Sequence, residues 1–578
     1  MIVIIDLELN NYIYILIIAM GGGLMNLVSE GQQNIILNGN PQRTFFKSVY
    51  QKYTNFGKQS FRVDFQGART LRLNEKSTFT FKIPRYADLL MDCYLSVELP
   101  NIWSGIMPPQ TVVNSAGETI YTPWAPYEFK WIDNIGAQMV SEILITCGNQ
   151  TLQQYSGQYL LSAVQRDFSG AKKELFDQMT GNVPELNDPA NAGTRVNAYP
   201  NAYYTTNPSG AEPSIRGKII YIPLNSWFGL KSQMAFPLVA LQYNELQITV
   251  TFRPINELFR IRDVFDYTNN FPYIAPNFNQ YYQQFYRFLQ PPPDIALGPT
   301  SYIDTRTIWN SDINLNCTYA FLSNDEVQLF AKSEQKYLFK QVHENIFYNV
   351  TGPNKIQLDS IGLVTSWMWY LQRSDANLRN EWSNYTNWPY NYIPNDLQLA
   401  PTVGTYPNPN PPPNTLGPGL NPDGTLTGLM ITGDYSMQNI KQILLGLGIL
   451  LDGQYRENIQ PAGVYNYIEK YTRTASNAPE GLYCYNFCLD TSPFNLQPSG
   501  AINMNRFNQI EFEFTTVIPQ LDPLAQVLTI CDPETGDIIG INKPTFRIYD
   551  YNFNLVLFEE RINLVTFVGG NAGLQYAT

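Results

Sequence analysis

The sequence predicts an all-β protein that contains two similar β-sandwiches in tandem. Three observations support this prediction: apolar and polar residues alternate in the regular stretches, helical patterns are few, and one strand motif recurs 264 residues later. The length of 578 residues also exceeds what a single hydrophobic core supports. We therefore expect at least two core-forming units.

The alternation is clearest in three stretches, 77–83, 94–100 and 314–322. In the first, STFTFKI, the apolar residues Phe79, Phe81 and Ile83 stand at every second position. Alternate side chains of a strand point to the same face, so such a stretch has one apolar and one polar face. This pattern is typical of antiparallel strands that are buried on one side.

Other segments interrupt the strand pattern. Helical periodicity is confined to about 159–179, 325–342 and 437–451, which is too little to flank a parallel sheet, so these helices should cap or cross the sandwiches. Residues 257–310 are rich in Tyr, Asn and Pro and predict a connector with a long loop. Residues 406–424 form a Pro-rich insertion, which we expect on the surface because proline cannot donate to a sheet ladder.

The internal repeat joins YNELQITVTF (243–252) and FNQIEFEFTT (507–516). Both run through an aromatic residue, Asn and Glu or Gln into alternating apolar and polar positions. In the second copy, Ile510, Phe512 and Phe514 share one face. Because each copy comes late in its half, the repeat indicates two copies of one β-domain.

No catalytic, cofactor or metal site is visible in the sequence, and we expect a protein that is not an enzyme. The single histidine, His343, has no recognisable nucleophile motif near it, and we expect it on the surface or in a loop. The six cysteines are scattered and predict buried, reduced thiols rather than a disulfide framework or metal site. The pair Trp367 and Trp369 falls on one face of an apolar strand, which favours core packing over a sugar-stacking platform.

The segment GNPQRTFFKSVYQKYTNF, residues 39–56, contrasts with the acidic chain; we call it the basic aromatic segment. Five basic residues and no acidic one lie between Gly31 and Val63, with aromatic residues among them. Basic residues mixed with stacking side chains are typical of single-strand nucleic-acid binders. However, the net charge of -12 argues against broad attraction to phosphates.

A family resemblance rests on the basic aromatic segment, WIDNIGAQMVSEILITCGNQ (131–150), LQYNELQITVTF (241–252), LLDGQYREN (450–458) and LQPSGAINMNRF (496–507). In these motifs the chain resembles the major capsid proteins of large icosahedral nucleocytoplasmic DNA viruses, and the matches appear in the family's order from about residue 21 to past residue 515. Arg43 departs from the family pattern, which usually has a β-branched residue there, and residues 1–19 have no counterpart.

The resemblance implies a double jelly roll, with two eight-stranded sandwiches in one chain. The expected divisions are an N-terminal extension and arm (1–43), a first jelly roll (44–256), the connector (257–310) and a second jelly roll (311–578). The resemblance also implies that three chains form a pseudo-hexagonal capsomer. These capsomers would build the capsid shell of a virion that is assembled in the host cytoplasm. The basic aromatic segment would then be an arm clamped beneath the capsomer.

The partners implied by the resemblance are two further copies of the chain, neighbouring capsomers, minor capsid and penton proteins, and internal membrane-associated viral proteins, without direct contact to nucleic acid. Two alternatives remain at this point. One is a secreted carbohydrate-binding or glycan-active β-sandwich protein, which would act as a monomer. The other is a nucleic-acid-binding protein, whose binding would depend on salt.

Overall fold

The structure is a computed structural model, and the chain divides into two units, Met1–Asn55 and Phe56–Thr578, which we describe separately. The described residues are 22–29, 31–67, 70–113, 117–206, 211–266, 271–388, 390–391, 417–420, 426–431, 440–519, 528–531, 538–542 and 551–576.

The described part of the first unit is a short, exposed segment. It contains helix α2 (Gly22–Val28), a 3-10 turn (Gln32–Asn34) and helix α3 (Ile35–Asn38). Residues 39–55 follow without helix or strand. Apolar side chains of α2 and α3, such as Leu27 and Leu37, remain exposed. This unit therefore has no core of its own within the described residues.

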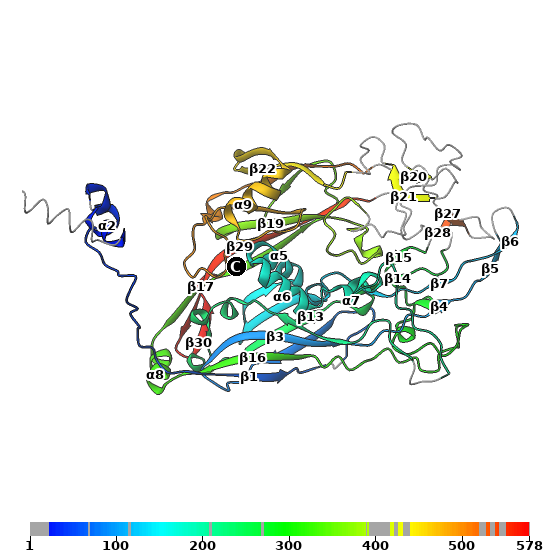
Figure 1. The fold of residues 1–578 in the computed structure, drawn as a ribbon, viewed down its shortest axis with the longest axis horizontal. Helices are drawn as coiled ribbons and strands as arrows, with labels where there is room; N and C mark the ends of the chain where they lie inside the picture. Colours follow the sequence, from blue (N-terminus) through cyan, green and yellow to red (C-terminus); the bar gives the residue numbers. More distant parts are fainter. Residues whose placement is uncertain are drawn as a thin grey trace, which may run out of the picture. The chain divides into compact units, whose positions relative to one another are not determined.

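The first sandwich of the second unit consists of two antiparallel sheets, with strand orders β1-β16-β3-β11 and β10-β9-β13-β2 (Figure 1). Its apolar core contains the inward side chains predicted from alternation, including Phe79 and Phe81. The strands are β1 (Gly57–Asp64), β2 (Ser77–Lys82), β3 (Leu89–Leu99), β9 (Val140–Cys147), β10 (Gln150–Tyr155), β11 (Lys218–Pro223), β13 (Leu246–Phe252) and β16 (Asn314–Phe321).

The second sandwich repeats this arrangement with the orders β17-β29-β19-β24 and β18-β26-β22-β23. A separate apolar core contains Trp367 and Trp369, which are fully buried as the sequence predicts. The strands are β17 (Gln335–Phe347), β18 (Pro353–Gln357), β19 (Leu363–Arg373), β22 (Leu444–Leu451), β23 (Gln454–Pro461), β24 (Leu482–Asn486), β26 (Ile510–Thr516) and β29 (Phe553–Val568).

The two sandwiches agree strand for strand. Numbered along the chain within each sandwich, one sheet has the order first, eighth, third, sixth, and the other has the order second, seventh, fourth, fifth. The repeated motifs are the seventh strands, β13 and β26, whose bounds differ by 264 residues at both ends. In both, every second residue is buried. The predicted double jelly roll is confirmed.

The connections between strands carry the helices. Helices α5 (Gly157–Asp167) and α6 (Gly170–Thr180) join the fifth and sixth strands of the first sandwich, and Ser156 caps α5 by accepting a hydrogen bond from the Tyr159 N–H. The equivalent connection of the second sandwich holds a π-helical turn (Val464–Ile468) and α9 (Glu469–Arg473). The predicted helix around 159–179 is therefore present as two helices.

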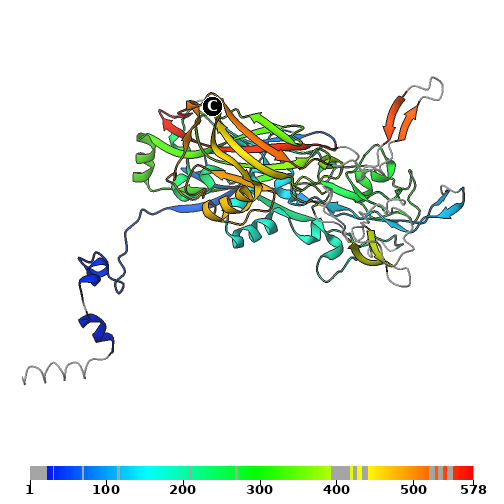
Figure 2. The same cartoon turned by 90° about the horizontal axis from the view of Figure 1, so that it is seen from above.

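The long connections gather at one end of the second unit (Figures 1 and 2). Their short strands are paired in small antiparallel ladders: β4 (Ile106–Met107), β5 (Thr111–Val113), β6 (Thr119–Tyr121), β7 (Ala125–Pro126), β8 (Lys130–Trp131), β14 (Phe259–Arg262), β15 (Tyr273–Ile274), β20 (Gly417–Leu420), β21 (Leu426–Ile431), β27 (Leu528–Cys531) and β28 (Ile538–Asn542). Three further short strands pair with strands of the main sheets: β12 (Phe236–Pro237) with β3, β25 (Ile502–Asn503) with β19, and β30 (Asn571–Leu574) with β29.

The strand pairing places residues differently from the expected division at 310. Strand β16, expected in the second jelly roll, pairs with β1 and β3 of the first. Residues 257–310 are therefore the connection between the seventh and eighth strands, and their side chains Phe259, Phe285 and Phe288 lie in the first core. We propose a boundary within helix α8 (Asn324–Lys332), which separates β16 from β17.

Two predicted helices are partly or wholly wrong. Residues 335–342, expected to continue a helix, belong to β17, and residues 444–451 form β22. In β22, Gly446 and Gly448 lie so close to β23 that a Cβ atom would meet the backbone of Gln460 or side chain of Ile459 at about 3.0 Å. Glycine weakens a helix, and the close packing of β22 against β23 stabilises the strand conformation instead.

The Pro-rich insertion 406–424 follows β19 in the chain. Most of it lies outside the described residues. The described part, β20, pairs with β21, so the expectation that proline keeps this insertion out of sheet ladders is wrong for Gly417–Leu420. Its predicted exposure stays a prediction.

Candidate assembly site

The junction of the two sandwiches joins the edge strands β10 and β17. Gln153 Nε2 donates to the Lys340 carbonyl oxygen at 3.2 Å, and Gln341 Nε2 donates to the Leu152 carbonyl oxygen at 3.1 Å. These side-chain amides satisfy backbone groups that an edge strand would otherwise leave open for pairing with another chain. The two sandwiches are thereby held side by side within one chain.

A buried ionic cluster lies behind this edge contact. Arg166 of α5 is fully buried, and its guanidinium contacts Asp167 and the Glu560 carboxylate of β29, both at 2.7 Å. Lys340 Nζ also contacts Glu560, at 3.0 Å. A buried charge is costly unless it is paired and hydrogen-bonded. The ion pairs of the cluster therefore form only when the two sandwiches pack together, because Arg166 belongs to the first sandwich and Glu560 to the second.

Hydrogen bonds complete the coordination of Glu560. The Tyr159 hydroxyl donates to Glu560 Oε1 at 2.9 Å, and the Ser366 hydroxyl donates to Glu560 Oε2 at 2.8 Å. Burial alone would raise the pKa of Glu560, but the charges of Arg166 and Lys340 outweigh it and hold this pKa well below its usual range. The carboxylate thus stays ionised and serves as a structural anchor rather than a proton donor.

A second contact region lies at the segment that follows β19. Asn380 Nδ2 donates to the carbonyl oxygens of Asn256 and Phe259, at 2.7 and 2.8 Å. Trp382 Nε1 donates to the Glu257 carbonyl oxygen at 2.9 Å, while the Arg253 guanidinium lies 4.5 Å from the ring centre of Trp382. This segment of the second sandwich therefore contacts the residues between the end of β13 and the start of β14 in the first.

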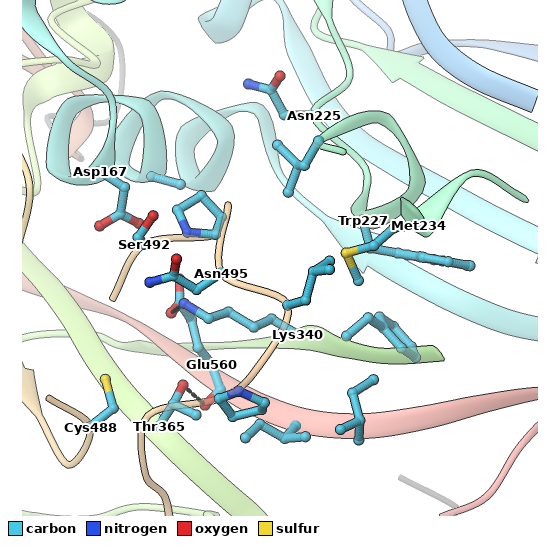
Figure 3. A pocket seen from close by; sticks show the side chains of 18 of the residues that line it. Asp167, Asn225, Trp227, Met234, Lys340, Thr365, Cys488, Ser492, Asn495 and Glu560 are labelled. Atoms are coloured by element: carbon cyan, nitrogen blue, oxygen red, sulfur yellow. Dashed lines mark hydrogen bonds and ion pairs between the residues drawn. The ribbon is translucent and has the colours of Figure 1, made fainter. Parts of the chain in front are cut away.

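A cavity of about 100 Å³ lies between α5, β17 and the segment 488–499 (Figure 3). Trp227 and Phe339 contribute to its apolar wall, and Lys340, Asp167 and Glu560 line its polar end. Within the described residues, the buried Trp227 Nε1–H has no hydrogen-bond partner. Both Asp167 and Glu560 are already engaged in ion pairs, so they are not free to act as an acid or base.

Within the residues that the structure describes, no group of three or more His, Cys, Asp or Glu side chains could hold a metal ion. The expectation that the chain has no catalytic site stays a prediction. His343 lies within β17, so the expected place in a loop is wrong, and its side chain is half-buried rather than fully exposed. Burial and the nearby Arg561 lower its pKa and favour the neutral imidazole. In the same described residues, no helix is both long and apolar enough to cross a bilayer.

The basic aromatic segment is exposed in the single chain. Phe45 and Phe46 are 88% and 100% exposed, and Tyr50 and Tyr53 are similarly open. The Arg43 guanidinium lies 5.3 Å from the ring centre of Phe45. Aromatic side chains that a monomer leaves open mark a surface for another molecule. Burial of these side chains, which the sequence predicts, stays a prediction about the assembled protein.

Comparison with known proteins identifies the family. The family described as "Major capsid protein N-terminus" matches residues 44–275, and the family described as "Large eukaryotic DNA virus major capsid protein" matches residues 326–563. The chain belongs to the major capsid proteins of large eukaryotic DNA viruses. This capsid protein is therefore a structural subunit of an icosahedral viral shell, and the alternative of a secreted glycan-binding protein is not supported.

Individual relatives agree with this assignment. The major capsid protein of Phaeocystis pouchetii virus is 23% identical over 96% of this chain and 100% of its own length. That of Paramecium bursaria Chlorella virus 1 is 24% identical, with the same coverage of both chains. The major capsid protein of Chrysochromulina ericina virus is 27% identical over 61% of this chain, and this capsid protein spans 58% of that relative's length.

Solved structures show the same fold. The quasi-atomic model of the PBCV-1 virus capsid matches 93% of this capsid protein and 100% of its own chain, with a TM-score of 0.56 and 18% identity. The Faustovirus major capsid protein matches 93% and 94%, with a TM-score of 0.56 and 13% identity. These matches agree with the double jelly roll seen in the strand order.

Sequence reasoning missed the residues that join the two halves of this capsid protein. Arg166 and Glu560 are 394 residues apart, so no local pattern connects them. A signal was nevertheless present, because the apolar strand FNLVLFEERINLVTFV carries Glu559, Glu560 and Arg561 at its centre. Three consecutive charged residues inside an apolar strand indicate a buried ionic network.

Proposed function

We propose that three copies of this chain form one capsomer, and that capsomers tile the shell. The supporting observation is the strand-for-strand equivalence of the two sandwiches. Three chains present six similar sandwiches around a threefold axis, so the capsomer can meet six neighbours in similar ways. Because each of the three chains holds two similar sandwiches side by side, the trimer would have a pseudo-hexagonal outline.

Light scattering of the purified full chain tests the trimer. We expect a particle with three times the mass of the 66.0 kDa chain at micromolar concentration. Permanent interfaces bury about 2,000 to 5,000 Å² or more, so the trimer should persist on dilution. A stable monomer under these conditions would contradict the proposal.

We propose that the basic aromatic segment packs beneath the capsomer and contacts protein. Its support is the exposure of Phe45 and Phe46 in the single chain. Nucleic-acid binding is the competing function, and it predicts affinity that falls by orders of magnitude between low and moderate salt. Titration of labelled single-stranded DNA against the wild type and against Arg43→Gln/Lys47→Gln/Lys52→Gln decides between them: we expect weak binding that is the same for both.

The remaining partners follow from the position of a shell subunit. They are neighbouring capsomers, minor capsid and penton proteins and, on the inner side, membrane-associated viral proteins. The protein would assemble in the host cytoplasm and end in the virion. A density map of the assembled particle tests these contacts, and direct contact between this chain and packaged DNA would contradict the proposal.

A further inference from the structure

Cys93 of β3 and Cys317 of β16 form a directly opposed pair in the first sandwich. The strand register places them opposite each other, and their Sγ atoms lie 3.5 Å apart. Both side chains are buried in the first core. By contrast, Cys147 of β9 lies opposite Gln150 and Leu246 and has no cysteine across either ladder.

The backbone geometry suits a disulfide. Opposed residues of antiparallel strands have Cα atoms about 4.5 to 5.5 Å apart, which falls within the range of about 4.4 to 6.8 Å found for disulfides. The sulfur atoms must approach to about 2.0 Å, which rotation of the two side chains toward each other provides. The ladder between β3 and β16 does not need to move apart.

We propose that Cys93 and Cys317 form an intrachain disulfide when the protein meets an oxidising environment. The oxidant is a low-molecular-weight disulfide such as oxidised glutathione. One S–S bond forms in the protein and one breaks in the oxidant, which takes up the two thiol hydrogens and leaves as two molecules of reduced glutathione. The chain becomes lighter by two hydrogen atoms.

The closed fold makes this reaction slow. The contact with Cys317 and burial raise the pKa of the Cys93 thiol, and the thiolate is the form that attacks a disulfide. The bond therefore forms during folding, or when β16 opens transiently. Because the bond is shielded from solvent, its reduction is slow for the same reason.

The bond would fasten the eighth strand to the third across a separation of 224 residues. Strand β16 lies between β1 and β3, so the bond also fixes the strand with which β1 pairs. If the protein is a shell subunit, the thiols stay reduced while the chain folds in the host cytoplasm, and they join in the released particle when β16 opens transiently. That timing rests on the proposed function, whereas formation of the bond does not.

The test uses the purified full chain, both native and refolded from urea, equilibrated with glutathione mixtures from reducing to oxidising. Free thiols are blocked with N-ethylmaleimide under denaturing conditions, and peptides are identified by mass spectrometry. In the oxidising mixtures we expect most refolded chains to carry a peptide pair joined through Cys93 and Cys317. The unfolding temperature of these chains should rise by about 5 °C over the reduced chain.

Two variants make the assignment specific. Cys317→Ala should lose the joined peptides and the temperature shift, while the control Cys147→Ala should keep both. Refolded wild-type chains in which Cys93 and Cys317 are both blocked by N-ethylmaleimide after oxidation would overturn the proposal, even if Cys317→Ala does not fold. The mass of the particle in the same samples reports on the proposed trimer separately.

Discussion

The two sandwiches share one strand order, yet their first and eighth strands meet different surroundings. In the first sandwich, β1 is largely exposed, with Val63 as its buried residue. In the second, the equivalent β17 is mostly half-buried and faces β10 across the junction. The eighth strands differ likewise: β16 buries Cys317, whereas β29 buries Glu559, Glu560 and Arg561. Equivalent strands therefore keep the same place in the sheet order. Their buried side chains differ because each strand packs against a different neighbouring surface.

Removing the anchor of the junction should have the largest effect. Glu560→Ala leaves Arg166 and Lys340 without their shared carboxylate, and breaking a buried pair costs about 3 to 5 kcal/mol in the free energy of unfolding. Urea denaturation measures this cost. The control is Lys336→Ala on the same strand as Lys340, because its ion pair with Glu334 is exposed and should contribute less than about 1 kcal/mol. Equal costs would show that the junction is not a special site.

Acid should weaken the second sandwich through Asp375. Burial would raise the pKa of this carboxyl, but Arg379 and Arg373 outweigh it and lower the pKa from 3.8 to about 2. Its stabilising contribution is therefore complete above about pH 4 and is lost as the pH falls toward 2. The stability difference between wild type and Asp375→Asn should shrink by roughly 2 kcal/mol over that range. Denaturation at pH 7, 4 and 2.5 tests this, and a constant difference would contradict it.

Buried isoleucines on the two seventh strands should respond alike. Ile248 of β13 and Ile510 of β26 are buried on the seventh strands of the two sandwiches. Ile248→Val and Ile510→Val each remove one methylene group, so each should cost about 0.5 to 1.5 kcal/mol. Amide hydrogen exchange shows which half each variant loosens. The prediction is wrong if both variants increase amide hydrogen exchange in the same sandwich.

The smallest effect on the stability of the single chain is expected in the basic aromatic segment. Because Phe45 and Phe46 are exposed, Phe45→Ala/Phe46→Ala should change the free energy of unfolding by less than about 0.5 kcal/mol. The same variant should nevertheless reduce the fraction of trimer or shell in light scattering. Arg43→Gln/Lys47→Gln/Lys52→Gln is the matched control and should assemble normally. Normal assembly of the phenylalanine variant together with impaired assembly of the charge variant would favour a role for the charges.

The sequence was informative where structure is periodic and local. Alternation predicted the buried faces of β2, β13 and β26, and the repeat predicted two equivalent sandwiches. It misplaced β16, because alternation identifies a strand but not the sheet that it joins. It also predicted a helix at β22, where the close approach of β23 to Gly446 and Gly448 decides the conformation. The Arg166 and Glu560 pair depends on tertiary structure alone.

The pairing of β1 with β16 also governs how the chain can fold during synthesis. Ser60 and Thr318, which contact each other across this pair, are 258 residues apart, and Tyr159 and Glu560 at the junction are 401 apart. Contacts of such high contact order form slowly. The first sandwich stays open until β16 has left the ribosome, and the junction stays open until β29 has followed. Nascent chains therefore expose unpaired strand edges for most of translation, the condition under which partly folded chains aggregate.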